Sequence, residues 1–281
     1  LSYTKTLETE TFFYPTLKSY KSEKSKLKKN VVLVILESFG YINDPDAKEY
    51  LLESLNDVKL NKKFHINSSK LETEKGSTVT AEFRELCGVK YNNYYKVHKD
   101  LICAPKIFDE LGYRTLAAHP HIGGYFNRKV WWKEIGFKET YFMNIINNKD
   151  LKKCNGTFNS YCDNEYFPKM FKKAISSEKP FFLYYLSVEG HLPVKKLSED
   201  DYLDCITKIK RDRLICGNLL INKSLIETVA QVIIDLEIED TDFYLVGDHE
   251  PISFLSQNSN TNLNNNFQAM QAISLISKTR E

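Results

Sequence analysis

Four short, mostly apolar runs alternate with longer amphipathic segments along this chain. The runs span residues 31–36, 113–118, 180–188 and 243–246 and are rich in β-branched or aromatic residues. Such runs are typical of strands that are buried on both faces of a sheet. Between them, apolar residues recur at helical spacing, most clearly over Asn218–Leu236. The alternation predicts an α/β fold with a mainly parallel sheet.

The same pattern predicts smaller elements. We expect three more helices and one short strand, over Pro45–Leu55, Ile107–Leu111, Asn164–Ile175 and Phe64–Ile66 respectively. Residues 147–161 are polar and predict a loop, and a second polar stretch, Gln257–Asn266, precedes an expected final helix. Residues 1–29 are rich in Lys, Ser and Thr and are interpreted as a lead-in that wraps the domain.

Polar side chains follow each of the four apolar runs. They are Glu37, His119, His191 and the Asp248–His249 pair. Because open α/β sheets keep their chemistry at the carboxyl ends of parallel strands, we expect these residues to meet at one edge of the sheet. Glu, Asp and His are ligands that suit Zn or Mn. The pattern therefore predicts a metal site there.

The segment Gly76-Ser-Thr78-Val-Thr80-Ala-Glu82-Phe83 resembles an N-capped helix start. A helix N-terminus stabilises anions, so a hydroxyl placed there can hold a phosphoryl group or act as a metal-activated nucleophile. Taken alone, the segment fits a plain capping threonine better. Similarly, His119, His121 and Arg128 suit an anion site and suit a surface loop equally well.

Composition excludes several classes of protein. The 281 residues carry a net charge of +2, which gives no indication of nucleic-acid binding. No apolar run approaches the roughly 18–20 residues of a membrane span, and no signal peptide is visible. The chain begins at Leu1 without a Met, so we expect a soluble piece of a longer protein.

The six cysteines form sequence-adjacent pairs, Cys87 with Cys103, Cys154 with Cys162, and Cys205 with Cys216. Local pairs of this kind suit three disulfides that close short loops, which indicates an oxidising compartment. Six reduced, buried cysteines are the alternative. Zinc-finger ligation is not expected, because no Cys-x2-Cys spacing occurs.

The order of the motifs resembles that of lipoteichoic acid synthases and related phosphoglycerol and phosphoethanolamine transferases, in the sulfatase branch of the alkaline phosphatase superfamily. The motifs are Val-Leu-Val-Ile-Leu-Glu37-Ser-Phe-Gly, Gly-Ser-Thr78-x3-Glu82-Phe83, His119-x8-Arg128, His191-x-Pro193 and Gly-Asp248-His249. The resemblance covers roughly residues 30–255. It implies a sulfatase-like three-layer sandwich, with a mainly parallel central sheet flanked by helices. It also implies a lead-in at 1–29 from an upstream membrane anchor and a catalytic domain at 30–281.

The resemblance assigns roles to residues. One Zn or Mn ion falls on the metal ligands Glu37, Thr78, Asp248 and His249. Contacts to the phosphate and head group of the substrate fall on His119, Phe126, Arg128 and His191, with Phe126 standing where the family has Trp in a Trp-Asn-Arg motif.

Two threonines compete for the role of nucleophile. Lipoteichoic acid synthases place the nucleophile four residues before the Glu-Phe pair, which selects Thr78. Phosphoethanolamine transferases place it in a Thr-Ala dipeptide, which matches Thr80-Ala81. We expect Thr78, with Thr80 as the alternative, because Gly76 and Glu82-Phe83 both align. The Cys/Ser-x-Pro-Ser-Arg motif of sulfatases is absent, so sulfate ester hydrolysis is not expected.

The implied reaction is a two-step transfer of phosphoethanolamine or phosphoglycerol. The donor is a phospholipid, the intermediate a phospho-threonine, and the acceptor a glycan or lipid of the cell envelope such as lipopolysaccharide. Cys154-x7-Cys162 is similar to a disulfide loop of Gram-negative phosphoethanolamine transferases, which implies the periplasmic face of the bacterial inner membrane. The alternatives are a phosphodiesterase or phosphatase of the same superfamily and a non-catalytic envelope glycan-binding domain.

Overall fold

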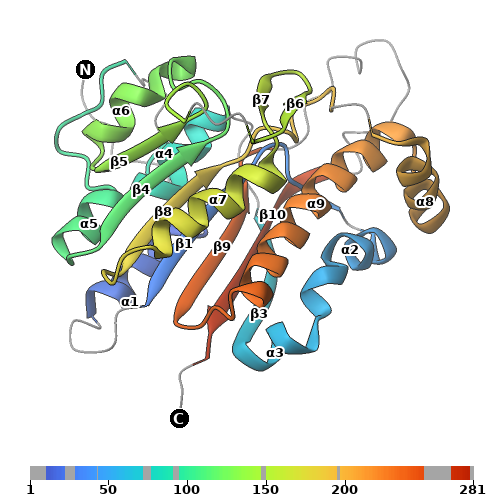
Figure 1. Cartoon of the computed structure of the whole chain (residues 1–281), viewed down its shortest axis with the longest axis horizontal. Coiled ribbons are helices and arrows are strands. Elements are labelled where there is room, and N and C mark those ends of the chain that lie inside the picture. Colours follow the sequence, from blue (N-terminus) through green and yellow to red (C-terminus); the bar gives the residue numbers. More distant parts are fainter. Residues whose placement is uncertain are drawn as a thin grey trace.

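A mainly parallel sheet forms the centre of the protein (Figure 1). The computed structural model describes residues 11–22, 29–42, 44–71, 77–90, 95–146, 150–194, 197–249 and 267–278. Within these residues the main sheet has eight strands, in the order β2-β10-β9-β1-β8-β4-β5, with β3 paired to β10. Their bounds are Gly40–Ile42 (β2), Phe267–Ser277 (β10), Thr241–Gly247 (β9), Asn30–Leu36 (β1), Phe181–Leu186 (β8), Arg114–His119 (β4), Glu139–Phe142 (β5) and Phe64–Leu71 (β3).

Strand β1 lies at the middle of the sheet. It pairs in parallel with β8 on one side and β9 on the other, with Leu33 opposite Tyr184 and Tyr244. Residues 31–36 are fully buried, which explains why this run has no polar residue. Strands β4 and β5 continue the parallel order, so the carboxyl ends of β1, β4, β8 and β9 meet at one edge.

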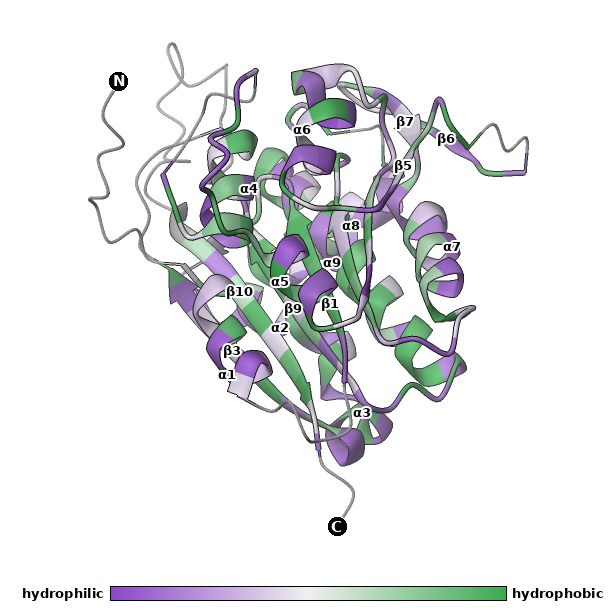
Figure 2. Cartoon of the chain, turned by 90° about the vertical axis from the view of Figure 1, so that its left-hand side faces the viewer, coloured by the Kyte–Doolittle hydropathy of each residue, from purple (hydrophilic) through white to green (hydrophobic). Residues whose placement is uncertain are grey.

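Successive residues of β1 face two separate apolar layers. Val32 and Val34 belong to a cluster that includes residues of α7 (Asp163–Ile175) and α9 (Arg213–Asp235). Val31 and Leu33 belong to a second cluster, with residues of α4 (Thr78–Cys87), α5 (Ala104–Glu110) and α6 (Arg128–Glu134). Helices therefore cover both faces of the sheet, and the strands lie in the hydrophobic interior (Figure 2). The predicted three-layer α/β fold is confirmed.

Smaller helices surround these layers. The elements η1 (Tyr14–Thr16) and α1 (Leu17–Ser22) precede β1, and η3 (Tyr125–Asn127) precedes α6. The elements α2 (Pro45–Leu52), η2 (Glu53–Asn56), α3 (Val58–Lys63) and α8 (Glu199–Ile209) lie beside α9. No helix in the described ranges is long and apolar enough to cross a bilayer.

Several predicted elements differ from the structure. The expected final helix is wrong, because residues 267–277 form β10, which pairs with β9, β2 and β3. Ala272, Ile273 and Leu275 are fully buried there, and pairing in the sheet overrides the helix propensity of Ala, Gln and Met. The predicted strand at Phe64–Ile66 continues to Leu71, because residues 64–71 pair with β10. The stretch Gln257–Asn266 lies outside the described residues.

Two further differences concern loops. The expected loop over residues 147–161 contains a hairpin, β6 (Lys153–Asn155) and β7 (Asn159–Tyr161). Helix α9 begins at Arg213, before the predicted start at Asn218, because the Asp212 side chain caps it by accepting from the amides of Leu214 and Ile215. Helix α8 was not predicted.

All three expected cysteine pairs form disulfides. The bond Cys87–Cys103 joins the end of α4 to the residue before α5, Cys154–Cys162 closes the hairpin before α7, and Cys205–Cys216 joins α8 to α9. No cysteine of the chain is free. The alternative of six reduced cysteines does not hold in this structure.

The described part of the lead-in packs against the sheet. The Phe13 side chain is fully buried and stacks on Phe182, with 5.6 Å between ring centroids. The Glu85 carboxylate accepts hydrogen bonds from the amides of Phe12 and Phe13, at 3.0 and 2.8 Å. Residues 12 and 13 are therefore anchored to α4, and the division into 1–29 and 30–281 stays a prediction.

Candidate functional site

Two acids and a histidine meet where β1 and β9 end. Oε1 of Glu37 lies 3.4 Å from Nε2 of His249, which lies 3.2 Å from Oδ2 of Asp248. One potential ligand atom from each of the three lies within 4.8 Å of the others. The side chains point toward one another because parallel pairing places Leu36 beside Gly247. The strand-end pattern thus brought Glu37, Asp248 and His249 together as expected.

Backbone contacts hold this cluster rigidly. The amides of Ser38 and His249 both donate to Oδ1 of Asp248, at 2.7 Å each. Ser38 itself has a left-handed backbone, with φ of 56°, which is uncommon for a residue other than glycine. A Cβ at Gly190 would collide with the backbone carbonyl of Glu37, so only glycine allows the loop after β8 to approach so closely.

The electrostatics of the cluster suit a cation. Burial raises the pKa of the Glu37 carboxyl, but the hydrogen bond and charge of His249, with the charges of His191 and Arg128, outweigh burial and hold that pKa below its ordinary value. Burial and the neighbouring charge of Glu37 raise the pKa of Asp248 to about 7. Oδ2 of Asp248 is buried and, although the His249 ring lies 3.2 Å away, it accepts no well-aligned hydrogen bond from the described residues. A bound cation would satisfy that oxygen and relieve the repulsion between the two acids.

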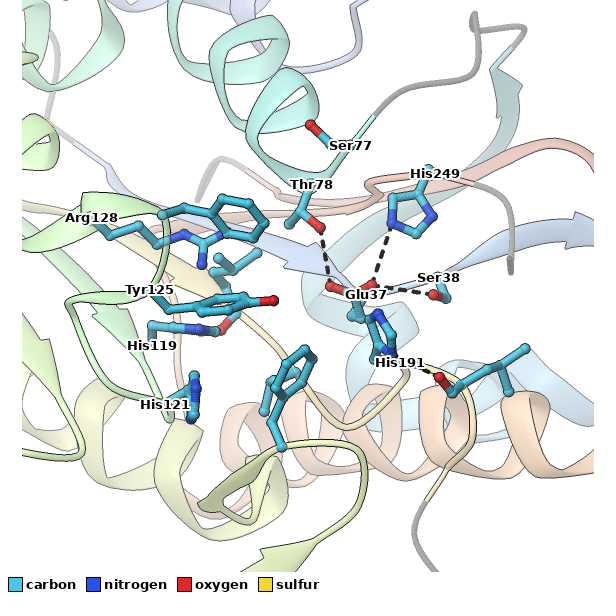
Figure 3. A pocket seen from close by; sticks show the side chains of 15 residues that line it. Glu37, Ser38, Ser77, Thr78, His119, His121, Tyr125, Arg128, His191 and His249 are labelled. Atoms are coloured by element: carbon cyan, nitrogen blue, oxygen red, sulfur yellow. Dashed lines mark hydrogen bonds and ion pairs between the residues drawn. The ribbon is translucent and has the colours of Figure 1, made fainter. Parts of the chain in front are cut away.

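Thr78 lies above this cluster at the start of α4. Ser77 caps the helix, with its hydroxyl accepting from the amide of Thr80 at 3.4 Å. The Thr78 hydroxyl donates to Oε2 of Glu37 at 3.3 Å and lines the same cavity (Figure 3). The Thr80 hydroxyl instead lies 3.2 Å from that of Ser77, and Thr80 does not line the cavity. Of the two threonines, Thr78 is therefore the one whose hydroxyl faces Glu37 and the cavity.

The cavity has a volume of about 180 Å³, and Arg128 forms part of its opposite side. The Arg128 side chain is 2% exposed and pairs with Oε2 of Glu82 at 2.9 Å. Trp132 and Tyr184 each donate to the other oxygen of Glu82 at 3.0 Å. The guanidinium also lies over the Phe126 ring, 5.1 Å from its centroid. A buried, fixed cation of this kind suits an anionic group of a ligand.

Histidines complete the cavity. The Nδ1 atom of His119 lies 2.9 Å from the carbonyl oxygen of Leu186, and that of His191 lies 2.8 Å from the carbonyl oxygen of Leu192. Burial and the charge of Arg128 hold the pKa of His119 well below its usual range. Both rings line the cavity, as do Phe126 and Arg128. All four predicted substrate contacts are therefore placed around one space.

The backbone before Arg128 is strained. Phe126 and Asn127 have φ of 51° and 55°, both in the left-handed region. Such conformations cost free energy and persist where the surrounding structure holds them, often at functional sites. This turn places Phe126 on the cavity and starts α6 at Arg128.

Sequence reasoning missed several residues that line the cavity. They are Ser38, Ser77, Tyr125, Phe158, Leu186, Val188 and Leu192. His121, which the sequence suggested for an anion site or for a surface loop, also lines the cavity. Nothing in the sequence indicated that Tyr125 and Phe158 lie beside it. Asn218, in α9, was not expected at the site, yet it donates to the carbonyl of Ser38 at 3.0 Å and supports the turn after Glu37.

Fold and site together define an α/β domain with an acid–histidine cluster and a helix-start hydroxyl at the carboxyl edge of its sheet. The family profile described as Sulfatase matches residues 29–265, so the chain belongs to the sulfatase family. The resemblance to the sulfatase branch of the alkaline phosphatase superfamily is thereby confirmed. No curated protein sequence matches the chain.

Solved structures of similar fold include a synthase, a transferase and a periplasmic domain. The lipoteichoic acid synthase LtaP from Listeria monocytogenes has a TM-score of 0.61 at 16% identity, over 94% of this chain and 72% of that one. The phosphoglycerol transferase GacH from Streptococcus pyogenes, in complex with sn-glycerol-1-phosphate, has a TM-score of 0.58 at 14% identity, over 97% of this chain and 78% of that one. The C-terminal periplasmic domain of EcEptC from Escherichia coli, in complex with Zn, has a TM-score of 0.57 at 15% identity, over 91% of this chain and 74% of that one. At these levels of sequence identity, the comparison shows a similar fold and nothing more.

Proposed function

We propose that this protein is a metal-dependent transferase that moves phosphoethanolamine or phosphoglycerol from a phospholipid to a glycan or lipid of the cell envelope. The observation that carries the proposal is the position of Thr78. Its hydroxyl lies at a helix N-terminus, 3.3 Å from Glu37, in a cavity that also holds the buried Arg128. Membership of the sulfatase family and the fold shared with transferases support the assignment.

The residues fit a single divalent ion. Glu37, Thr78, Asp248 and His249 would hold Zn or Mn, since they supply hard oxygen ligands and one imidazole around the unsatisfied Oδ2 of Asp248. When bound, the ion supplies positive charge that favours the alkoxide of Thr78 and the charged oxygens of the phosphate.

Thr78 acts as the nucleophile in the proposed first step. Its Oγ1 attacks the phosphorus of the donor, the bond from phosphorus to the diacylglycerol oxygen breaks, and that oxygen leaves with a proton as diacylglycerol. The N-terminus of α4 and the guanidinium of Arg128 stabilise the negative charge of the phosphoryl oxygens. In the second step a hydroxyl of the acceptor attacks the same phosphorus, and Thr78 recovers its proton.

The cellular setting is part of the proposal. Three disulfides suit an oxidising compartment, and a related fold is that of a periplasmic domain. We place the domain at the periplasmic face of a bacterial inner membrane, held there through a segment upstream of residue 1. Its partners are then a phospholipid donor and an envelope acceptor.

Incubation with phospholipid vesicles and Mn or Zn, followed by mass spectrometry, tests the function. A peptide containing Thr78 should gain the mass of phosphoethanolamine or phosphoglycerol, and diacylglycerol should be released. The variant Thr78→Ala should lose both signals, whereas Thr80→Ala should keep them. The reverse result would move the nucleophile to Thr80, and release of the free phosphorylated head group into water, without transfer to any acceptor, would identify a hydrolase.

A further inference from the structure

Three aromatic rings meet where the loop after β4, η3 and the β6–β7 hairpin border the cavity. The rings of His121, Tyr125 and Phe158, here called the ring corner, lie within 5.3–5.6 Å of one another between centroids. His191 adds a fourth ring, 5.0 Å from Phe158. All four line the cavity that contains Thr78. The proposed reaction uses none of the three ring-corner side chains.

Separate segments of the chain build the ring corner. His121 follows β4, Tyr125 lies in η3, and Phe158 lies between β6 and β7 of the hairpin. The hairpin is tied to the loop after β4, because the Tyr161 amide donates to the carbonyl of Pro120 at 3.0 Å. The disulfide Cys154–Cys162 closes the same hairpin. Phe158 is therefore held in place by two constraints.

The chemistry of the ring corner suits a cation that carries N–H donors. Nδ1 of His121 lies 2.9 Å from the carbonyl oxygen of Asn159, so this nitrogen carries the hydrogen and Nε2 is left as an acceptor. Burial and the charge of Arg128 lower the pKa of His121, so its ring is neutral near pH 7. The faces of Tyr125 and Phe158 carry the partial negative charge that attracts ammonium groups.

Carboxylates contribute little to this end of the cavity. Among the described residues that line it, Glu37 is the one acid, and it belongs to the proposed metal site. A cationic head group would therefore be recognised by rings and by a neutral imidazole. A glycerol head group would gain hydrogen bonds here but no cation–π attraction.

We propose that the ring corner binds the primary ammonium of an ethanolamine head group, with His121 as acceptor and Tyr125 and Phe158 as the cation–π faces. This inference rests on the proposed function and selects phosphoethanolamine, rather than phosphoglycerol, as the group transferred. The phosphate would lie between Thr78 and Arg128, and the ammonium would extend toward the hairpin.

Competing donors test the inference. Vesicles with one neutral matrix would carry fluorescent diacyl lipids with an ethanolamine, choline or glycerol head group, and release of fluorescent diacylglycerol would be measured with metal-loaded protein. The ethanolamine lipid should be used with a kcat/KM about tenfold above that of the glycerol lipid. Equal use of the two lipids would overturn the inference and leave the proposed function standing.

Two kinds of variant test the aromatic faces and the hydrogen-bond acceptor separately. Tyr125→Leu and Phe158→Leu should raise KM for the ethanolamine lipid about tenfold and change KM for the glycerol lipid less than twofold. His121→Phe keeps a ring but removes the hydrogen-bond acceptor. It should therefore lower kcat/KM for the ethanolamine lipid and leave kcat/KM for the choline lipid unchanged. Tyr95→Leu, at an exposed residue that does not line the cavity, is the matched control. Thermal unfolding would confirm that each variant is folded.

Three other outcomes are decisive. A loss for all lipids alike in Tyr125→Leu and Phe158→Leu would mean that the rings only support the cavity, which overturns the inference. A preference for the choline lipid would overturn the assignment of a primary ammonium. Failure of the folded, metal-bound protein to release diacylglycerol from any lipid would instead overturn the proposed function, and the inference with it.

Discussion

The two sides of the cavity are built in different ways. Glu37, Asp248 and His249, here called the acid side, are at most 8% exposed, and amides of the residues that follow β1 and β9 hold the Asp248 carboxylate. The opposite side is formed by His121 in the loop after β4, Tyr125 and Phe126 in the short element η3, Arg128 at the start of α6 and Phe158 in the β6–β7 hairpin, and Tyr125 is 39% exposed. A rigid sheet edge suits the reaction centre, and loops suit the choice of substrate, since loops change without loss of the core.

Loss of one acid should have the largest effect. Glu37→Gln keeps the shape of the side chain but removes the charge that would hold the metal. We expect metal affinity, measured by calorimetry, to fall more than about 100-fold and turnover to fall with it. The metal-free protein should stay folded, because the substitution removes repulsion between Glu37 and Asp248. Glu139→Gln, on the edge strand β5, should leave affinity unchanged. Stoichiometric metal in Glu37→Gln would mean that the acid side is not a metal site.

Among the residues of the opposite side, Arg128 is as deeply buried as those of the acid side. Arg128→Met leaves the Glu82 charge buried with neutral donors alone, so we expect a loss of about 3–5 kcal/mol in the free energy of unfolding. Adding Glu82→Gln should restore most of that stability, as urea unfolding would show. Arg114→Met, which breaks a more exposed pair with Glu139, should cost about 1 kcal/mol or less.

Kinetics distinguish a catalytic Arg128 from a structural one. The double variant Glu82→Gln/Arg128→Met should remain about 10²–10³-fold slower than the unmodified protein, although it is stable. Recovery of turnover together with stability would show that Arg128 serves the fold and does not stabilise the phosphate.

The same contrast explains what the sequence could predict. Glu37 and the Asp248–His249 pair follow apolar runs that could only be buried strands, and parallel strands end at one edge, so their meeting followed from the pattern. The motif alignment favoured Thr78 over Thr80, but the sequence could not show which hydroxyl faces Glu37, since their directions depend on where α4 starts, and Ser77 sets that start. Tyr125 and Phe158 meet through a hairpin whose path no periodicity encodes. Strand β10 was missed because its Ala, Gln and Met residues favour a helix until a sheet pairs them.

Arg84 offers the finest test, because it touches the acid side without lining the cavity. It is buried in α4 and donates to the backbone carbonyls of Gly247 and Asp248, at 3.0 and 3.3 Å. Its Nε also donates to Glu85 at 2.8 Å, and Glu85 in turn holds the amides of Phe12 and Phe13. A chain of hydrogen bonds therefore joins the segment before β1 to the end of β9.

Arg84→Met removes the link in the middle of this chain. We expect metal affinity to fall about tenfold, because the carbonyls that orient Asp248 and His249 lose their donors. The preference between ethanolamine and glycerol lipids should not change, since no ring-corner residue contacts Arg84 in the hydrogen bonds described. Glu85→Gln, which keeps an acceptor for Phe12 and Phe13, should have a smaller effect on affinity. An unchanged affinity in Arg84→Met, or a shift in lipid preference, would show that the two sides of the cavity are not built independently.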